Sequence, residues 1–182
     1  MTFDNLLAAA QRDPSAADLH ALRMAYTRSP DYRPYTHDTE HLDALRAALR
    51  QNDLEAALEA VQHLLNYNYL DIEAHMSADY LYLRQDDADR SAYHRAFAKG
   101  LLDAILATGN GRSMESAFIV ISVPEEYTVL KVLKLKPAQQ ALIQHKGHWF
   151  DMFDVQHPDT GSFKLYFNID LPHNWLQAHM EQ

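Results

Sequence analysis

The chain has 182 residues, of which 47% are apolar and 23% charged, a composition typical of one compact domain or two small ones. It contains no cysteine, which excludes disulfides, a thiol nucleophile and Cys-ligated zinc. The formal charge of −9, without a basic stripe, excludes nucleic-acid binding and is explained by solubility or by a basic partner.

The N-terminus contains Asp4 but no basic segment followed by an apolar run, so the sequence predicts no secretory signal. No apolar run approaches the roughly 20 residues that a membrane-spanning helix needs. We therefore expect a cytoplasmic protein that does not contact a membrane.

Residues 1–111 have the apolar spacing of helices. Two short helices are expected before a proline-punctuated loop at 31–35. Four regular helices are then expected between Asp38 and Thr108, each with an apolar stripe. The clearest stripe consists of Leu54, Ala57, Leu58, Val61, Leu64 and Leu65.

The turns between these helices form a repeat. Residues 52–57 and 85–90 lie 33 positions apart. The first of these turns resembles the turn of tetratricopeptide repeats, whose period is ~34 residues. Residues 71–75 resemble the segment that opens the next repeat. The sequence thus predicts antiparallel, tetratricopeptide-like helix pairs, whose apolar faces need a cover.

Residues 112–182 are predicted to form a small region with an antiparallel sheet. The expected elements are a buried strand over Ala117–Val123, a helix from Glu125, a hairpin around Lys146-Gly147, a strand over 163–169 and a closing helix with Trp175. The predicted fold class is therefore α+β, with about four mainly antiparallel strands packed against the helical residues 1–111.

Five short segments spread over most of the chain carry a family resemblance: Leu22–Thr27, Asp71–His75, Gly100–Leu102 after His94, Glu125–Tyr127 and Leu165–Asn168. Together they resemble a bacterial family of uncharacterised proteins, the domain of unknown function 4919. The resemblance implies a bacterial protein and no particular activity. It also implies that many members are exported, whereas this N-terminus has no recognisable signal.

His75 and His94 form the best candidate site. They lie 10 and 9 residues from Gln85, on the two helices that flank this turn, so an antiparallel pair would place them at nearly the same level. Asp79 lies one turn from His75 on the same face, and Arg23 could join them. A metal or anion site and a structural polar network both fit. The network is favoured because no third ligand is evident, and neither a metal nor a cofactor is predicted.

Tyrosines gather around the second repeat, at positions 67, 69, 80, 82 and 93. Tyrosine is common at interfaces, but core positions between repeats are the favoured explanation. Tyr82 is expected to be exposed, because it lies opposite the apolar stripe of its helix. The candidate binding residues are Arg23, Tyr26, His75, Asp79, Tyr82 and His94.

Three other pairs have simpler explanations: His145 with His148, His37 with His41, and Glu125 with Glu126. The first pair flanks a turn and would face across the hairpin. The second lacks the glutamate of a zincin motif. The third stands at a helix N-terminus, where the helix dipole favours acidic residues.

The leading hypothesis is a non-enzymatic protein- or peptide-binding module of helical-repeat type, with a partner that could be basic. An inhibitor or immunity-type protein is one version of it. The alternative is a hydrolase-like or metal-dependent enzyme that uses His75, His94, Asp79 and Glu126. A concave site with perturbed pKa values would favour the enzyme, whereas full burial with every polar atom paired would count against it.

Overall fold

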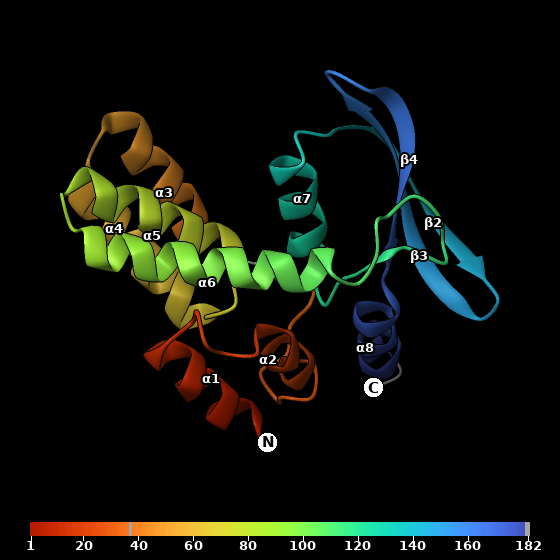
Figure 1. The fold of residues 1–182 in the computed structure, drawn as a ribbon, viewed down its shortest axis with the longest axis horizontal. Helices are drawn as coiled ribbons and strands as arrows, with labels where there is room; N and C mark the ends of the chain where they lie inside the picture. Colours follow the sequence, from red (N-terminus) through yellow and green to blue (C-terminus); the bar gives the residue numbers. More distant parts are fainter. Residues whose placement is uncertain (37, 181–182) are drawn as a thin grey trace. The chain divides into compact units, whose positions relative to one another are not determined.

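The computed structural model describes residues 1–36 and 38–180 (Figure 1). These residues form, in chain order, α1 (Phe3–Arg12), α2 (Leu19–Tyr26), α3 (Thr39–Gln51), α4 (Leu54–Tyr67), α5 (Ile72–Arg84), α6 (Ala88–Leu106), β1 (Phe118–Ile119), α7 (Val123–Val132), β2 (Lys136–His145), β3 (His148–His157), β4 (Gly161–Asn168) and α8 (Asp170–Met180). The α+β class predicted from the sequence is confirmed.

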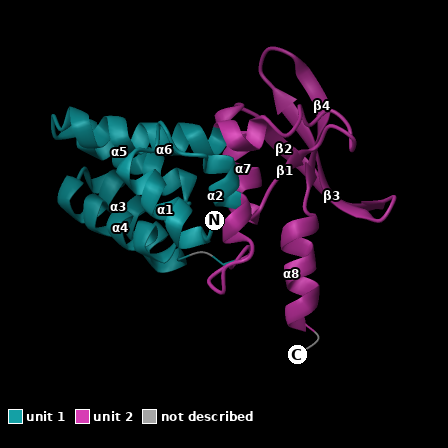
Figure 2. Ribbon diagram, turned by 60° about the horizontal axis from the view of Figure 1, so that its bottom comes forward, with its two compact units in different colours: residues 1–23, 36–102 teal, residues 24–35, 103–182 magenta. Residues whose placement is uncertain are grey.

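The chain divides into two compact units (Figure 2). Unit 1 contains residues 1–23 and 36–102, and unit 2 contains residues 24–35 and 103–182. The boundary crosses α6. Unit 1 has 15 acidic and 8 basic residues, a formal charge of −7, whereas unit 2 has a formal charge of −2. Most of the negative charge therefore belongs to unit 1.

The four consecutive helices α3 to α6 all begin with the same device, an aspartate whose side chain accepts a hydrogen bond from a backbone amide three residues ahead. The caps are Asp38, Asp53, Asp71 and Asp87. Each cap satisfies an amide that has no partner within its helix, and its charge suits the positive end of the helix dipole. The starts of these helices are thus encoded locally.

Two helical hairpins, α3/α4 and α5/α6, make up most of unit 1 (Figure 1). At the predicted turns, Asn52 and Asp86 adopt left-handed backbone conformations, with φ of 55° and 59°. Apolar residues of α3, α4 and α5 form a common core, namely Leu45, Ala48, Ala57, Ala60, Val61, Leu64, Leu65, Ala74, Ala78, Leu81 and Tyr82. The predicted stripe on α4 supplies four of them, namely Ala57, Val61, Leu64 and Leu65.

Unit 2 contains a four-stranded sheet in the order β1-β4-β3-β2. The β2/β3 and β3/β4 pairs are antiparallel, and only β1 runs parallel to its neighbour. Lys146 and Gly147 form the predicted two-residue turn, with φ of 51° and 85°, which matches the positive values that tight hairpin turns require. The prediction of a four-stranded, mainly antiparallel sheet is confirmed.

The predicted strand over Ala117–Val123 is wrong in length, because β1 covers only Phe118–Ile119. The backbone of Ile121 explains the early end. Its amide donates to Oε2 of Glu125 at 2.8 Å, and its carbonyl accepts from the hydroxyl of Tyr32. Side chains therefore occupy the groups that a longer strand would use for its ladder. The next helix, α7, already begins at Val123.

Candidate functional site

The predicted approach of His75 and His94 is confirmed. His75 comes from α5 and His94 from α6, and their Nδ1 atoms lie 2.9 Å apart. The ring centroids are 5.1 Å apart. His75 is fully buried and stacks on Phe97 with centroids 4.3 Å apart. The two imidazoles thus join the helices of the second hairpin.

The hydrogen bonds of His75 determine the tautomers of the pair. Nε2 of His75 lies 2.9 Å from the carbonyl oxygen of Tyr69. A carbonyl only accepts, so this Nε2 carries a proton. Burial lowers the pKa of His75 to about 4, so the ring is neutral at pH 7 and its Nδ1 accepts. His94 must then donate from Nδ1, which leaves its own Nε2 as the unprotonated nitrogen.

His94 is half-buried, and its Nε2 has no hydrogen-bond partner among the described residues. Burial lowers the pKa of His94, and the charge of Asp79 opposes this effect. His94 is therefore a neutral ring with one available acceptor at physiological pH.

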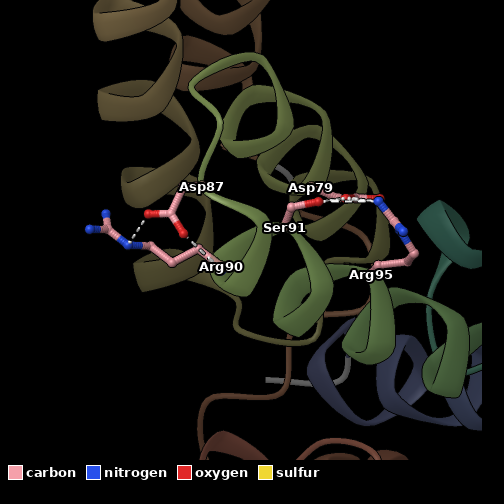
Figure 3. A network of polar contacts seen from close by, with 5 residues as sticks. All are labelled: Asp79, Asp87, Arg90, Ser91 and Arg95. Atoms are coloured by element: carbon pink, nitrogen blue, oxygen red, sulfur yellow. Dashed lines mark hydrogen bonds and ion pairs between the residues drawn. The ribbon is translucent and has the colours of Figure 1, made fainter.

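Asp79 forms the centre of a second network on the same hairpin (Figure 3). Arg95 donates to both of its oxygens, at 3.0 and 2.9 Å, and the hydroxyl of Ser91 donates at 2.6 Å. Partial burial would raise the pKa of Asp79, but the hydrogen bonds from Arg95 and Ser91 outweigh it and lower the pKa. Bidentate pairing of this kind fixes the carboxylate in place. Asp87 and Arg90 form a separate pair near the turn.

The expectation that Tyr82 is exposed is wrong, since only 8% of it is accessible. Side chains of α6 cover its ring. His94 stacks on it with centroids 5.5 Å apart, and the guanidinium of Arg90 lies 5.1 Å from its centroid. The side of α5 opposite Met76, Tyr80 and Leu83 thus faces α6, the second helix of the hairpin. The spacing of apolar residues within one helix does not reveal this contact.

The remaining candidate binding residues are also buried. Arg23 is fully buried in unit 1. Tyr26 is buried in unit 2, where its hydroxyl donates to the carbonyl of Asp31 at 3.1 Å. Four of the six candidates, Arg23, Tyr26, His75 and Tyr82, therefore lie below the surface, and only Asp79 and His94 are partly accessible.

The apolar stripe that α5 does expose consists of Met76, Tyr80 and Leu83, at positions i, i+4 and i+7 of one helix face. Their accessible fractions are 38, 47 and 55%. Arg84 donates to the hydroxyl of Tyr80 at 2.7 Å and to the side chain of Asn52 at 3.1 Å. The second bond places the end of α3 beside the end of α5.

Unit 2 contains a buried acidic pair where the sequence predicts only an interaction with the helix dipole. Glu125 and Glu126 are 5% and 0% accessible. Burial, followed by the charge and carboxyl group of Asp151, raises the pKa of Glu126 to about 9. Glu126 is therefore protonated at neutral pH.

Asp151 of β3 is the partner of Glu126. Burial raises its pKa, whereas hydrogen bonds from Gln140 and Glu126 oppose the increase. Gln140 of β2 donates to Asp151 at 2.9 Å and accepts from the hydroxyl of Tyr127 at 3.3 Å. Burial and the charges of Asp151 and Glu126 also raise the pKa of the exposed Tyr35. One proton and one negative charge are thus held between two carboxyl groups.

The other histidines lie in local contacts. His145 and His148 are paired across the hairpin as expected, and His148 also bonds to Asp170 at 2.6 Å. His41 bonds to Asp38 at 2.7 Å and stacks on His63. His37 lies outside the described residues. Within residues 1–36 and 38–180, no group of three or more His, Cys, Asp or Glu side chains is arranged to hold a metal ion.

A family model described as "Domain of unknown function (DUF4919)" matches residues 3–177. The chain belongs to this family. Neither a curated protein nor a solved structure is significantly similar to this DUF4919 chain. Among the described helices of the DUF4919 chain, none is long and apolar enough to cross a membrane.

The sequence contained a signal for the acidic pair of this DUF4919 protein. In β3, Asp151 alternates in phase with Phe153 and Val155, both of which are buried. In α7, Glu126 precedes the buried Val129 and Leu130 by three and four residues. Two acidic residues at core-facing positions of neighbouring elements indicate a buried carboxyl pair.

Proposed function

We propose that this DUF4919 protein is a non-enzymatic binding module of helical-repeat type, in which unit 1 binds a basic segment of a protein partner. The observation that carries the proposal is the exposed stripe of Met76, Tyr80 and Leu83 on α5. Large apolar side chains at i, i+4 and i+7 are the usual anchors between a helix face and a bound segment. An inhibitor or immunity-type role, with a basic toxin as partner, is one form of it.

The surroundings of Tyr80 support this proposal. Arg84 holds the Tyr80 hydroxyl and also bonds to Asn52 at the end of α3. Leu49, one turn before Asn52, is 38% accessible. The first helix of each hairpin therefore contributes exposed apolar side chains, as in helical-repeat proteins that bind peptides along one helix of each pair. The Arg84 contacts restrict Tyr80 before binding and so lower the entropic cost of binding.

Charge selects the class of partner. Unit 1 has a formal charge of −7, and its field attracts basic segments and repels acidic ones. A basic amphipathic segment would combine this attraction with apolar contact to the α5 stripe. Binding of this kind weakens as salt is added, because mobile ions screen the long-range component.

The enzyme alternative has less support from the same region. Both ring nitrogens of His75 are used in hydrogen bonds, and the carboxylate of Asp79 is held by Arg95 and Ser91. These contacts explain the group as a polar network that fixes the α5/α6 hairpin. His94 keeps an available acceptor at its Nε2.

The test is selection of peptides from a display library on the intact protein, followed by affinity measurements on two matched variants. Leu83 and Leu142 are 55% and 56% accessible, but Leu83 lies on α5 of unit 1 and Leu142 on β2 of unit 2. We expect basic, amphipathic peptides to be enriched, and Leu83→Ser to weaken their binding about tenfold, the effect of a lost apolar anchor. Leu142→Ser should leave it unchanged. Equal effects of the two variants, or failure to enrich basic peptides, would refute the proposal.

A further inference from the structure

Unit 2 contains a surface cavity at the end of the sheet where β2 begins and β3 ends. The cavity has a volume of about 640 Å³ and lies between residues 134–136, which follow α7, and the turn that joins β3 to β4. A volume of this size suits a small organic molecule. All of the lining residues belong to unit 2, so the cavity does not depend on the α5 stripe of unit 1.

The lining contains two lysines and no acidic residue. The lysines are Lys134 and Lys136, and neither has an ion-pair partner among the described residues. Asp154 and Asp159 are close in sequence to the lining but do not belong to it, and Asp154 pairs with Lys164 at 3.1 Å. Acidic residues outnumber basic ones by 25 to 16 in this chain, yet the cavity presents only positive charge, which attracts an anion.

The position of Lys134 is a second observation. The helix α7 ends in a Schellman motif, in which the amide of Leu135 donates to the carbonyl of Leu130 at 2.8 Å and Lys134 has a φ of 55°. Glycine suits such a left-handed position best, and a side chain there costs stability. The helix dipole favours a cation at this end of α7, but it does not explain Lys136, which lies beyond the helix in β2.

Three neutral lining side chains add hydrogen-bond donors. Lys136, Gln156 and Ser162 are aligned across three strands, because Lys136 pairs with Gln156 and Gln156 with Ser162. Residues directly opposite each other on neighbouring strands project from the same face of a sheet. The third donor is His157, whose Nδ1 accepts from the amide of Asp159 at 3.1 Å, so its Nε2 carries the ring proton. Amide, hydroxyl and imidazole donors thus accompany the two ammonium groups.

We propose that this cavity binds a small phosphate monoester, whose phosphoryl group pairs with Lys134 and Lys136. A phosphate monoester carries nearly two negative charges at neutral pH and three acceptor oxygens. It therefore matches two ammonium groups and the neighbouring donors of Gln156 and Ser162. A carboxylate matches less well, because it has one charge and a planar shape that suits arginine better than lysine. The buried Leu135 gives the lining an apolar part for the organic portion of the ester.

The test is titration of the whole protein with phenyl phosphate, followed by NMR of the backbone amides. Signals from residues 134–136 and 156–162 should shift, and the shifts should saturate. Lys134→Gly and Lys136→Gln should each weaken binding about tenfold, the effect of one lost hydrogen bond to a charged group. Lys146→Gln is the control, because Lys146 also has a positive φ, of 51°, but lies in the turn at the opposite end of β2. It removes the same charge and should leave the affinity unchanged.

The Lys134→Gly variant separates binding from folding. Glycine adopts a positive φ without strain, so this variant should unfold at the temperature of the wild type or above it. A loss of phenyl phosphate binding in a protein of undiminished stability then reports the lost ammonium group. Lys136→Gln tests the second lysine independently of the backbone at position 134.

Three results would overturn the proposal: no saturable shift in the wild type, equal weakening by Lys146→Gln, or binding of benzoate as tight as that of phenyl phosphate. Inorganic phosphate tests the organic portion of the ligand. Phenyl phosphate should bind more tightly than inorganic phosphate, because its ring can contact Leu135. Equal affinities would overturn the assignment of an ester.

Discussion

Replacement of Glu126 by glutamine is expected to stabilise the protein at neutral pH. The pKa of Glu126 is about 9 in the folded protein, against roughly 4.3 to 4.5 in an unfolded chain. The unfolded state therefore loses this proton well below pH 7, while the folded state retains it. The difference of about 2.5 pH units between 4.5 and 7 costs about 3 kcal/mol of stability at pH 7.

The sign of this effect sets its pH dependence. A raised folded pKa of an acid leaves stability intact below pH 4.5 and removes it as pH rises toward 9. Glutamine cannot ionise, so Glu126→Gln removes the penalty. The gain in unfolding free energy should grow from less than about 1 kcal/mol at pH 5 to about 3 kcal/mol at pH 7. The amide can also donate to Asp151.

Urea denaturation followed by circular dichroism at pH 5, 6, 7 and 8 measures this gain directly. Glu115→Gln is the control. Glu115 is exposed, and hydrogen bonds to its own backbone amide and to Ser113 lower its pKa, so any effect has the opposite sign. A difference between wild type and Glu126→Gln that stays constant across pH would refute the reasoning, as would a loss of stability at pH 7.

Three further substitutions each test a single position. The pKa of His75 is lowered to about 4 in the folded protein, so the unfolded chain takes up this proton first as the pH falls. The free energy of unfolding should therefore decrease by about 3 kcal/mol between pH 6.5 and pH 4. In His75→Gln, the free energy of unfolding should depend less steeply on pH over this range. Gly109→Ala would place a methyl group against the backbone carbonyl of Ser116 and should cost more than about 2 kcal/mol. Gly147→Ala, at a positive φ of 85° with open space around it, should cost only about 1 kcal/mol. Thermal unfolding of the two glycine variants measures both effects.

Much of the fold follows from local signals in the sequence. The helix starts of unit 1 can be predicted because aspartates such as Asp38 and Asp71 directly precede stretches with helical apolar spacing. The hairpin around Lys146-Gly147 can also be predicted from local sequence, since two stretches of strand-like pattern flank a two-residue turn. The approach of His75 and His94 needed only the geometry of an antiparallel hairpin.

The predictions that the structure contradicts depend on contacts between separate segments of the chain. The sequence pattern predicts that Ile121 belongs to a strand, but the side chains of Glu125 and Tyr32 bond to its backbone amide and carbonyl. The pattern predicts that Tyr82 is exposed, because nothing within α5 indicates that His94 and Arg90 of α6 cover its ring. The position of Glu126 at a helix N-terminus predicts an interaction with the helix dipole. Its spacing from the buried residues Val129 and Leu130 indicates instead that its side chain faces the core.

Methionine methyl NMR tests the binding face most directly, because the chain has only six methionines. Met76 belongs to the α5 stripe, whereas Met152 lies on β3 and Met180 ends α8. Titration with a basic amphipathic peptide selected on the protein should shift the Met76 signal and leave those of Met152 and Met180 in place. Shifts at Met152 or Met180 with an unchanged Met76 would contradict the assignment of the α5 stripe as the binding surface.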